Sequence, residues 1–156
     1  MKKYVKVVLV ASILLGLTGC GSNKEEIVNH CTLNSNNTAS GYKLTSEYDV
    51  YSVDGEVNKV VTKEVVTSDN QEVLDYFETY LKQTYDAQNE AYGGTTNEVT
   101  NENGTVTSTT TIDYNKMDLD KYLEENTALS NYMNENNKLK TDGVISIYES
   151  MGAVCE

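Results

Sequence analysis

The sequence predicts an α+β fold in which an antiparallel β-sheet is packed by one long α-helix and one or two short α-helices. Two dipeptides, Asp54-Gly55 and Asn103-Gly104, predict the sheet, because each lies between strand-like segments and favours the two-residue turn of a β-hairpin. Apolar residues at helical spacing between these hairpins predict the long helix. Runs of strands followed by helices are typical of α+β domains.

The first strand is predicted at residues 27–33, where apolar and polar residues mix. Residues 34–40 are rich in Asn and Ser and are predicted as a turn. The next strand shows the clearest alternation, with apolar residues on one face and polar residues on the other. The apolar positions of this strand are Tyr42, Leu44, Tyr48 and Val50.

The Val-rich residues 56–67 are predicted as the strand that returns from the Asp54-Gly55 turn. Pairing across this turn would place Tyr48 opposite Val61. It would also place Leu44 opposite Val65, on the same face. We therefore expect these four residues to form part of the core side of the sheet.

The long helix is predicted from an N-cap at Ser68, with Gln71 three residues later as in a capping box, to about Tyr92. Gly93-Gly94 then ends it. The residues expected at helical spacing along its buried side are Leu74, Phe77, Leu81, Thr84 or Tyr85, and Gln88.

The second hairpin is predicted at residues 95–102 and 105–113, and its Thr-rich composition indicates one solvated face. Residues 116–123 and 129–133 are predicted as short helical pieces. A final helix, capped by Thr141 or Asp142, would bury Val144, Ile145, Tyr148 and Met151 and stop at Gly152. Residues 153–155 are predicted as a last strand.

The amino terminus has the pattern of a bacterial lipoprotein signal peptide. Three lysines precede an apolar run of about eleven residues, shorter than the roughly 20 that a membrane-spanning helix needs. The run ends in Leu17-Thr18-Gly19-Cys20, which resembles a lipobox. We therefore predict a cleaved leader at 1–19, a lipidated Cys20 with a flexible tether at 20–26, and a single domain at 27–156.

This anchor predicts a protein attached to the cell membrane by acyl chains on Cys20, on the extracytoplasmic face. The chain has 12 basic and 24 acidic residues, for a net charge of −12. Loss of the leader removes three lysines, so the mature chain has 9 lysines against 24 acids and a net charge of −15. Nucleic-acid binding is not expected, because it requires clustered cations.

Cys31 and Cys155 are the two thiols that remain once Cys20 is lipidated. Outside the reducing cytoplasm, an even number of cysteines favours a disulfide over free or metal-binding thiols. A bond between the first and last strands would stabilise the domain by about 4 to 5 kcal/mol in the chain-entropy model. No CxxC redox motif is present.

Few residues favour catalysis or cofactor binding. His30 is the only histidine, and a His next to a Cys in a strand points to the opposite face, so a Cys–His dyad is not expected. Asp118 and Asp120, with Asp113 nearby, are typical of an acidic helix start, although they could also group oxygens for a hard cation. We predict no catalytic residue, no metal site and no cofactor.

Three tyrosines of the long helix, Tyr76, Tyr80 and Tyr92, are weak candidates for a binding surface that contacts a glycan or a peptide. The chain has no Trp and a single Phe, so we favour the alternative that these rings complete the edge of the core.

Three blocks of the chain resemble the YehR-like family of small bacterial lipoproteins. They are Leu-Thr-Gly-Cys at 17–20, Thr-Ile-Asp-Tyr-Asn-Lys-Met-Asp-Leu at 111–119, and Tyr-Glu-Ser-Met-Gly-Ala at 148–153. The resemblance implies a compact α+β domain on the outer face of a membrane, with no assigned activity and no functional residues to carry over. Members of this family lack the Cys31 and Cys155 pair, so the resemblance does not imply the disulfide.

The sequence as a whole favours a non-catalytic binding or structural module of the cell envelope, which would present a sheet face or the tyrosine-bearing helix to an envelope protein or a wall polymer. The alternative is a carboxylate- or cation-dependent extracellular hydrolase, which requires a concave pocket with converging carboxylates and a raised pKa.

Overall fold

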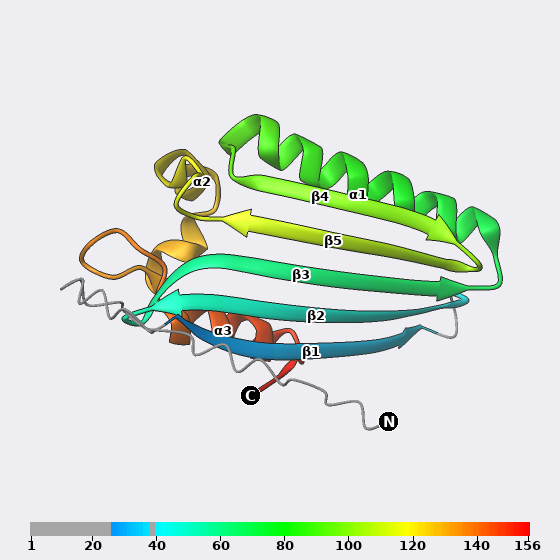
Figure 1. Cartoon of the computed structure of the whole chain (residues 1–156), viewed down its shortest axis with the longest axis horizontal. Helices are drawn as coiled ribbons and strands as arrows, with labels where there is room; N and C mark the ends of the chain where they lie inside the picture. Colours follow the sequence, from blue (N-terminus) through cyan, green and yellow to red (C-terminus); the bar gives the residue numbers. More distant parts are fainter. Residues whose placement is uncertain (1–25, 38–39) are drawn as a thin grey trace, which may run out of the picture.

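The computed structural model describes residues 26–37 and 40–156 and has the predicted α+β fold (Figure 1). The predicted leader, Cys20 and all but the last residue of the predicted tether lie outside the described residues. The strands form one antiparallel sheet in the order β4-β5-β3-β2-β1-β6. The elements are β1 Ile27–Asn37, β2 Tyr42–Val53, β3 Glu56–Ser68, α1 Gln71–Tyr92, β4 Thr95–Glu102, β5 Thr105–Asp113, α2 Leu119–Glu125, the 3₁₀-helix η1 Thr127–Tyr132, α3 Thr141–Ser150 and β6 Val154–Cys155.

The predicted turn at residues 34–40 is wrong in its first half, because β1 continues to Asn37. Each residue of β1 has a partner on β2, from Ile27 opposite Ser52 to Asn37 opposite Tyr42. Pairing with the long strand β2 therefore overrides the weak β-propensity of the Asn and Ser residues.

The first hairpin turns at Asp54-Gly55 as predicted, and both residues have positive φ. The predicted register is wrong, because Tyr48 lies opposite Thr62 and Leu44 lies opposite Val66. The register shifts between Tyr51 and Ser52, which is a β-bulge or a similar irregularity. One extra residue in one strand moves every later side chain to the other face of the sheet.

Val60 and Val66 consequently lie on the face of the sheet that packs against helices, which we call the helix face. Val61 and Val65 alternate with them and lie on the opposite face, which we call the open face. The prediction that Val61 and Val65 lie on the core side is therefore wrong.

Helix α1 begins two residues later than predicted. Its N-cap is Asn70, whose side chain accepts a hydrogen bond from the backbone N–H of Glu72. Ser68 is instead the last residue of β3, and its hydroxyl donates to the carbonyl oxygen of Gly41. The helix ends at Tyr92 before Gly93, as predicted.

The second hairpin has the predicted strand limits and turns at Asn103-Gly104, both with positive φ. The short helical pieces are shifted by a few residues, to α2 and η1. The N-cap of α3 is Lys140, not Thr141 or Asp142. Met151 follows α3 and is exposed, so its predicted burial is wrong, whereas Val144 is buried.

Helices α1 and α3 pack on the helix face at two places. In Figure 1, α1 runs alongside β4 and β5, and α3 lies at β1 and β2. The apolar cluster under α1 contains Val66, Leu74, Leu81 and Val106. The cluster under α3 contains Val50, Val57, Val60, Leu139 and Val144.

A belt of polar residues crosses the helix face between these two clusters. Ser46 and Ser108 flank Glu64 in neighbouring strands, and Thr110 flanks Thr62. All except Glu64 are buried. Hydrogen bonds compensate for burying such groups: Ser108 and Thr110, for example, both donate to the side-chain oxygen of Asn97.

Within residues 26–37 and 40–156, none of the helices combines the length and the apolar character that crossing a bilayer requires.

Candidate functional site

A disulfide joins Cys31 of β1 to Cys155 of β6, as predicted. The two residues lie directly opposite each other in the antiparallel pair, with their Cα atoms 4.0 Å apart. Cys31 is fully buried and packs with Tyr48 and Ala153. The bond therefore holds the two-residue terminal strand against the first strand of the sheet.

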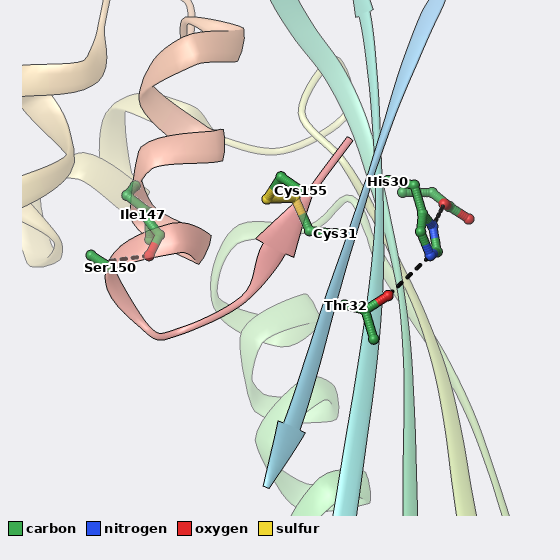
Figure 2. The surroundings of a disulfide bond; sticks show 7 residues. His30, Cys31, Thr32, Ile147, Ser150 and Cys155 are labelled. Carbon is green, nitrogen blue, oxygen red and sulfur yellow. Dashed lines mark hydrogen bonds and ion pairs between the residues drawn. A yellow bond between two sulfur atoms is a disulfide. The ribbon is translucent and has the colours of Figure 1, made fainter.

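His30 lies on the other side of β1 from this disulfide, as the alternation of a strand requires (Figure 2). Its Nδ1 is 2.7 Å from Oδ1 of Asp49 on β2, and its Nε2 is 3.2 Å from the hydroxyl oxygen of Thr32. The hydrogen bond to Asp49 raises the pKa of His30, and the nearby carboxylates of Glu47 and Glu156 raise it further.

This chain of hydrogen bonds is not predictable from the sequence, because Asp49 meets His30 only through the pairing of β1 with β2. The order of groups resembles that of a nucleophile, a base and an orienting acid. Thr32, however, lies within a strand whose backbone pairs with Val154 on β6, so its own amide is not available as an oxyanion donor. We therefore interpret the arrangement as one that orients the imidazole on the open face.

Two of the three candidate tyrosines form an exposed pair, which we call the tyrosine strip. The side chains of Tyr76 and Tyr80 are 63% and 51% exposed, so the favoured prediction that they belong to the core edge is wrong. Their rings are stacked, with centroids 6.0 Å apart and an interplanar angle of 11°. Residues four apart lie on one side of a helix, and Leu74 and Leu81 already occupy the buried side of α1.

Tyr92 is separate from the strip. Its ring packs edge-on against Tyr122 of α2, and its hydroxyl donates a hydrogen bond to the carboxylate of Glu125. This hydrogen bond raises the pKa of Tyr92. Tyr92 therefore joins the end of α1 to α2, a structural role close to the predicted one at the edge of the core.

A hollow of about 300 Å³ lies beside the strip. Its aromatic wall is continuous, because the ring of Phe77 packs edge-on against both Tyr42, at 4.9 Å, and Tyr76, at 5.5 Å. This hollow is not predictable from the sequence, because Tyr42 belongs to β2, which is distant from α1 along the chain. The residues that line it are Ser40, Tyr42, Asn70, Glu72, Val73, Tyr76 and Phe77.

Glu64 is a carboxylate in the polar belt of the helix face. Burial raises the pKa of this carboxyl, and the hydroxyl of Tyr85, which donates to it at 3.1 Å, partly offsets that effect. Tyr85 itself has a raised pKa, chiefly because it is buried. The pair links α1 to the centre of the sheet.

The acidic residues considered for cation binding each have a different partner. Asp118 caps α2 by accepting from the backbone N–H of Lys121, which confirms the expectation of an acidic helix start. Asp113 pairs with Lys116, and Asp120 accepts from the side chain of Asn137. In the part of the chain that the structure describes, no three His, Cys, Asp or Glu residues are grouped to hold a metal.

Among solved structures, the chain is similar to an NMR structure of a protein from Streptococcus pneumoniae TIGR4. The two are 17% identical with a TM-score of 0.52, and the match covers 100% of this chain and 99% of the other. At this identity, the similarity shows the fold alone. No family model and no curated protein matches the chain.

Proposed function

We propose that this protein is a lipid-anchored, extracytoplasmic binding module of the bacterial cell envelope, with the tyrosine strip of α1 as its binding surface. The observation that carries the proposal is the exposure of two adjacent large aromatic side chains, Tyr76 and Tyr80, beside an aromatic hollow. We propose that the protein holds a partner at the membrane surface and does not catalyse a reaction.

The proposed location is supported by the lipobox ending at Cys20 and by the bond between Cys31 and Cys155. Disulfides form and persist mainly in oxidising compartments outside the cytoplasm. The resemblance to YehR-like lipoproteins agrees with this location, and we propose membership of that family on the three blocks described above.

The proposed binding role is supported by the chemistry of tyrosine. A tyrosine side chain offers a large contact area and loses little conformational entropy on binding, because few of its bonds rotate. Its hydroxyl can also form a hydrogen bond with a partner. Exposed aromatic groups that gather in one place are typical of interaction surfaces, whereas single exposed apolar residues are common on any protein.

A photo-crosslinking amino acid placed at Thr79 tests the proposal in living cells. Thr79 is exposed and lies three residues from Tyr76 on α1. We expect a discrete crosslinked product from this position that is lost when Tyr76 and Tyr80 are both changed to Ser. The matched control is Thr96, exposed on β4. Crosslinking that is equal from both positions, or unchanged in the double variant, would refute the proposed surface.

A further inference from the structure

Two half-buried tyrosine rings of this protein, those of Tyr51 and Tyr92, each lie close to a lysine. The ammonium of Lys59 lies 3.8 Å from the centroid of the Tyr51 ring, and that of Lys121 lies 5.8 Å from the centroid of Tyr92. A cation over an aromatic face is attracted to the negative potential of the ring. Among the described residues, no lysine has this relation to Tyr76 or Tyr80.

The wall of the aromatic hollow carries a negative charge that no lysine of the described chain neutralises. Glu72 lines the hollow beside Tyr76, is exposed, and forms no ion pair within the described residues. In contrast, Glu78 on another side of α1 is paired with Lys82 at 2.6 Å. Lys43 lines an adjoining hollow that shares Tyr42, but it does not line this one.

We propose that the tyrosine strip and Glu72 bind a cationic side chain, namely a lysine or arginine in a basic peptide segment of a partner protein. This inference rests on the proposed function and specifies its ligand. The rings and the carboxylate supply the two attractions that an ammonium or guanidinium group requires, a negative ring face and an opposite charge.

Charge also distinguishes this partner from others. The mature chain carries a net charge of −15, so a second copy of the chain or an anionic polymer would be repelled. A neutral glycan would stack on the rings but would form no ion pair with Glu72. The cationic segment is the ligand that complements both features.

The test is a proton NMR titration of a short peptide containing trimethyl-lysine with the purified full-length protein. N-methyl protons held over an aromatic ring move upfield, and simple attraction between distant charges does not produce this shift. We expect an upfield shift on binding to the native protein and to the variant Tyr76→Phe/Tyr80→Phe, which keeps both rings. The variant Tyr76→Ser/Tyr80→Ser should lose the shift and bind about fivefold to tenfold more weakly.

A pair of charge variants tests the carboxylate. Glu72→Gln should weaken binding of the same peptide by about twofold to fivefold, as expected for the loss of an exposed ion pair. Glu98→Gln on β4 removes the same charge from an exposed position and should have a smaller effect. Near-native unfolding temperatures of all variants would show that they remain folded.

The cationic assignment is overturned if the trimethyl-lysine signal is unchanged by the native protein, if the double serine variant gives the same shift, or if Glu72→Gln and Glu98→Gln weaken binding equally. Equal binding of a matched peptide that has uncharged acetyl-lysine in place of trimethyl-lysine would also overturn the cationic assignment. In any of these cases, crosslinking from position 79 that depends on Tyr76 and Tyr80 would leave the proposed binding function standing. Loss of that dependence would refute the function itself.

Discussion

His30 and Asp49 form a side-chain pair across β1 and β2, with 2.7 Å between Nδ1 and Oδ1, on the open face of the sheet. The disulfide lies on the opposite side of the same strand (Figure 2). The terminal strand continues this junction, because His30 and Glu156 exchange two backbone hydrogen bonds. The disulfide and the His30–Asp49 pair therefore lie on opposite sides of β1, at the place where the first and last strands of the described chain pair.

The His30–Asp49 pair predicts a small dependence of stability on pH. The pKa of His30 is raised in the folded protein above its unfolded value of 6.5. The stabilisation by protonated His30 is therefore fully present below pH 6.5, and it is lost as the pH rises through the pKa of His30 in the folded protein. Because both side chains are more than a third exposed, solvent screening limits the effect to less than about 1 kcal/mol.

Urea unfolding of the native protein and of Asp49→Asn measures this effect. We expect the difference in the free energy of unfolding to be larger at about pH 5.5 than at about pH 8.5, where the imidazole is largely neutral. A difference that grows with pH would contradict the sign of the raised pKa.

The disulfide predicts a large dependence of stability on the redox state. Cys31 and Cys155 are 124 residues apart in the sequence. Closing a loop of that size lowers the entropy of the unfolded chain, and the bond should add about 4 to 5 kcal/mol to the free energy of unfolding. Urea unfolding with and without dithiothreitol measures the difference, and equal midpoints under the two conditions would exclude a stabilising bond.

Glu64→Gln is predicted to stabilise the protein at neutral pH. The raised pKa of Glu64 means that ionising this partly buried carboxyl opposes folding at a pH above its unfolded value of 4.5. Gln removes the charge and keeps an oxygen that accepts from Tyr85, so we expect a gain of about 1 kcal/mol at pH 7. Below about pH 4 the two proteins should be equally stable, because Glu64 is then neutral as well.

The control for this prediction is the exposed residue Glu98, whose change to Gln should alter the free energy of unfolding by less than about 0.5 kcal/mol. Thermal or urea unfolding of both variants at the two pH values makes the comparison. Destabilisation by Glu64→Gln at pH 7 would show that the charged form is favoured by a contact that this account omits.

Gly94→Ala is predicted to be strongly destabilising. Gly94 has a φ of +71°, and an added Cβ would lie 2.6 Å from the carbonyl oxygen of Asp113 and 2.8 Å from the amide of Met117. The steric conflict is with backbone and cannot be relieved by a side-chain rotation, so we expect a loss of more than about 2 kcal/mol.

Gly55→Ala is the matched control, because Gly55 has a similar φ of +78° but nothing within 4 Å of the added Cβ. Only the conformational cost of about 1 to 2 kcal/mol should remain. Urea unfolding compares the two variants, and an equal loss in both would show that the close approach at Gly94 is relieved at no cost.

The sequence predicted those parts of the fold that depend on local chemistry. Asp54-Gly55 and Asn103-Gly104 specify their turns because only a few residues tolerate positive φ at both positions. The end of α1 at Gly93 has the same kind of local cause. The cysteine pairing followed from the parity of the cysteines and from their positions in the first and last strands.

Features that depend on pairing between distant segments were not predictable in this way. The register shift at Tyr51 and Ser52 moved Val61 and Val65 to the open face, and no local pattern marks it. The contact of His30 with Asp49 needs the register of β1 on β2. The exposure of Tyr76 was misjudged from composition, although its helical position opposite the buried leucines could have indicated it.

Fatty-acid labelling at Cys20 tests the central claim, that this domain is held at the outer surface of a membrane, most directly. Cells that express the full-length protein, or its Cys20→Ser variant, would be grown with an alkyne-tagged palmitate, and the protein would then be isolated and probed for the tag. We expect label on the native protein in the membrane fraction and none on the variant. An unlabelled native protein, or equal label on both, would contradict it.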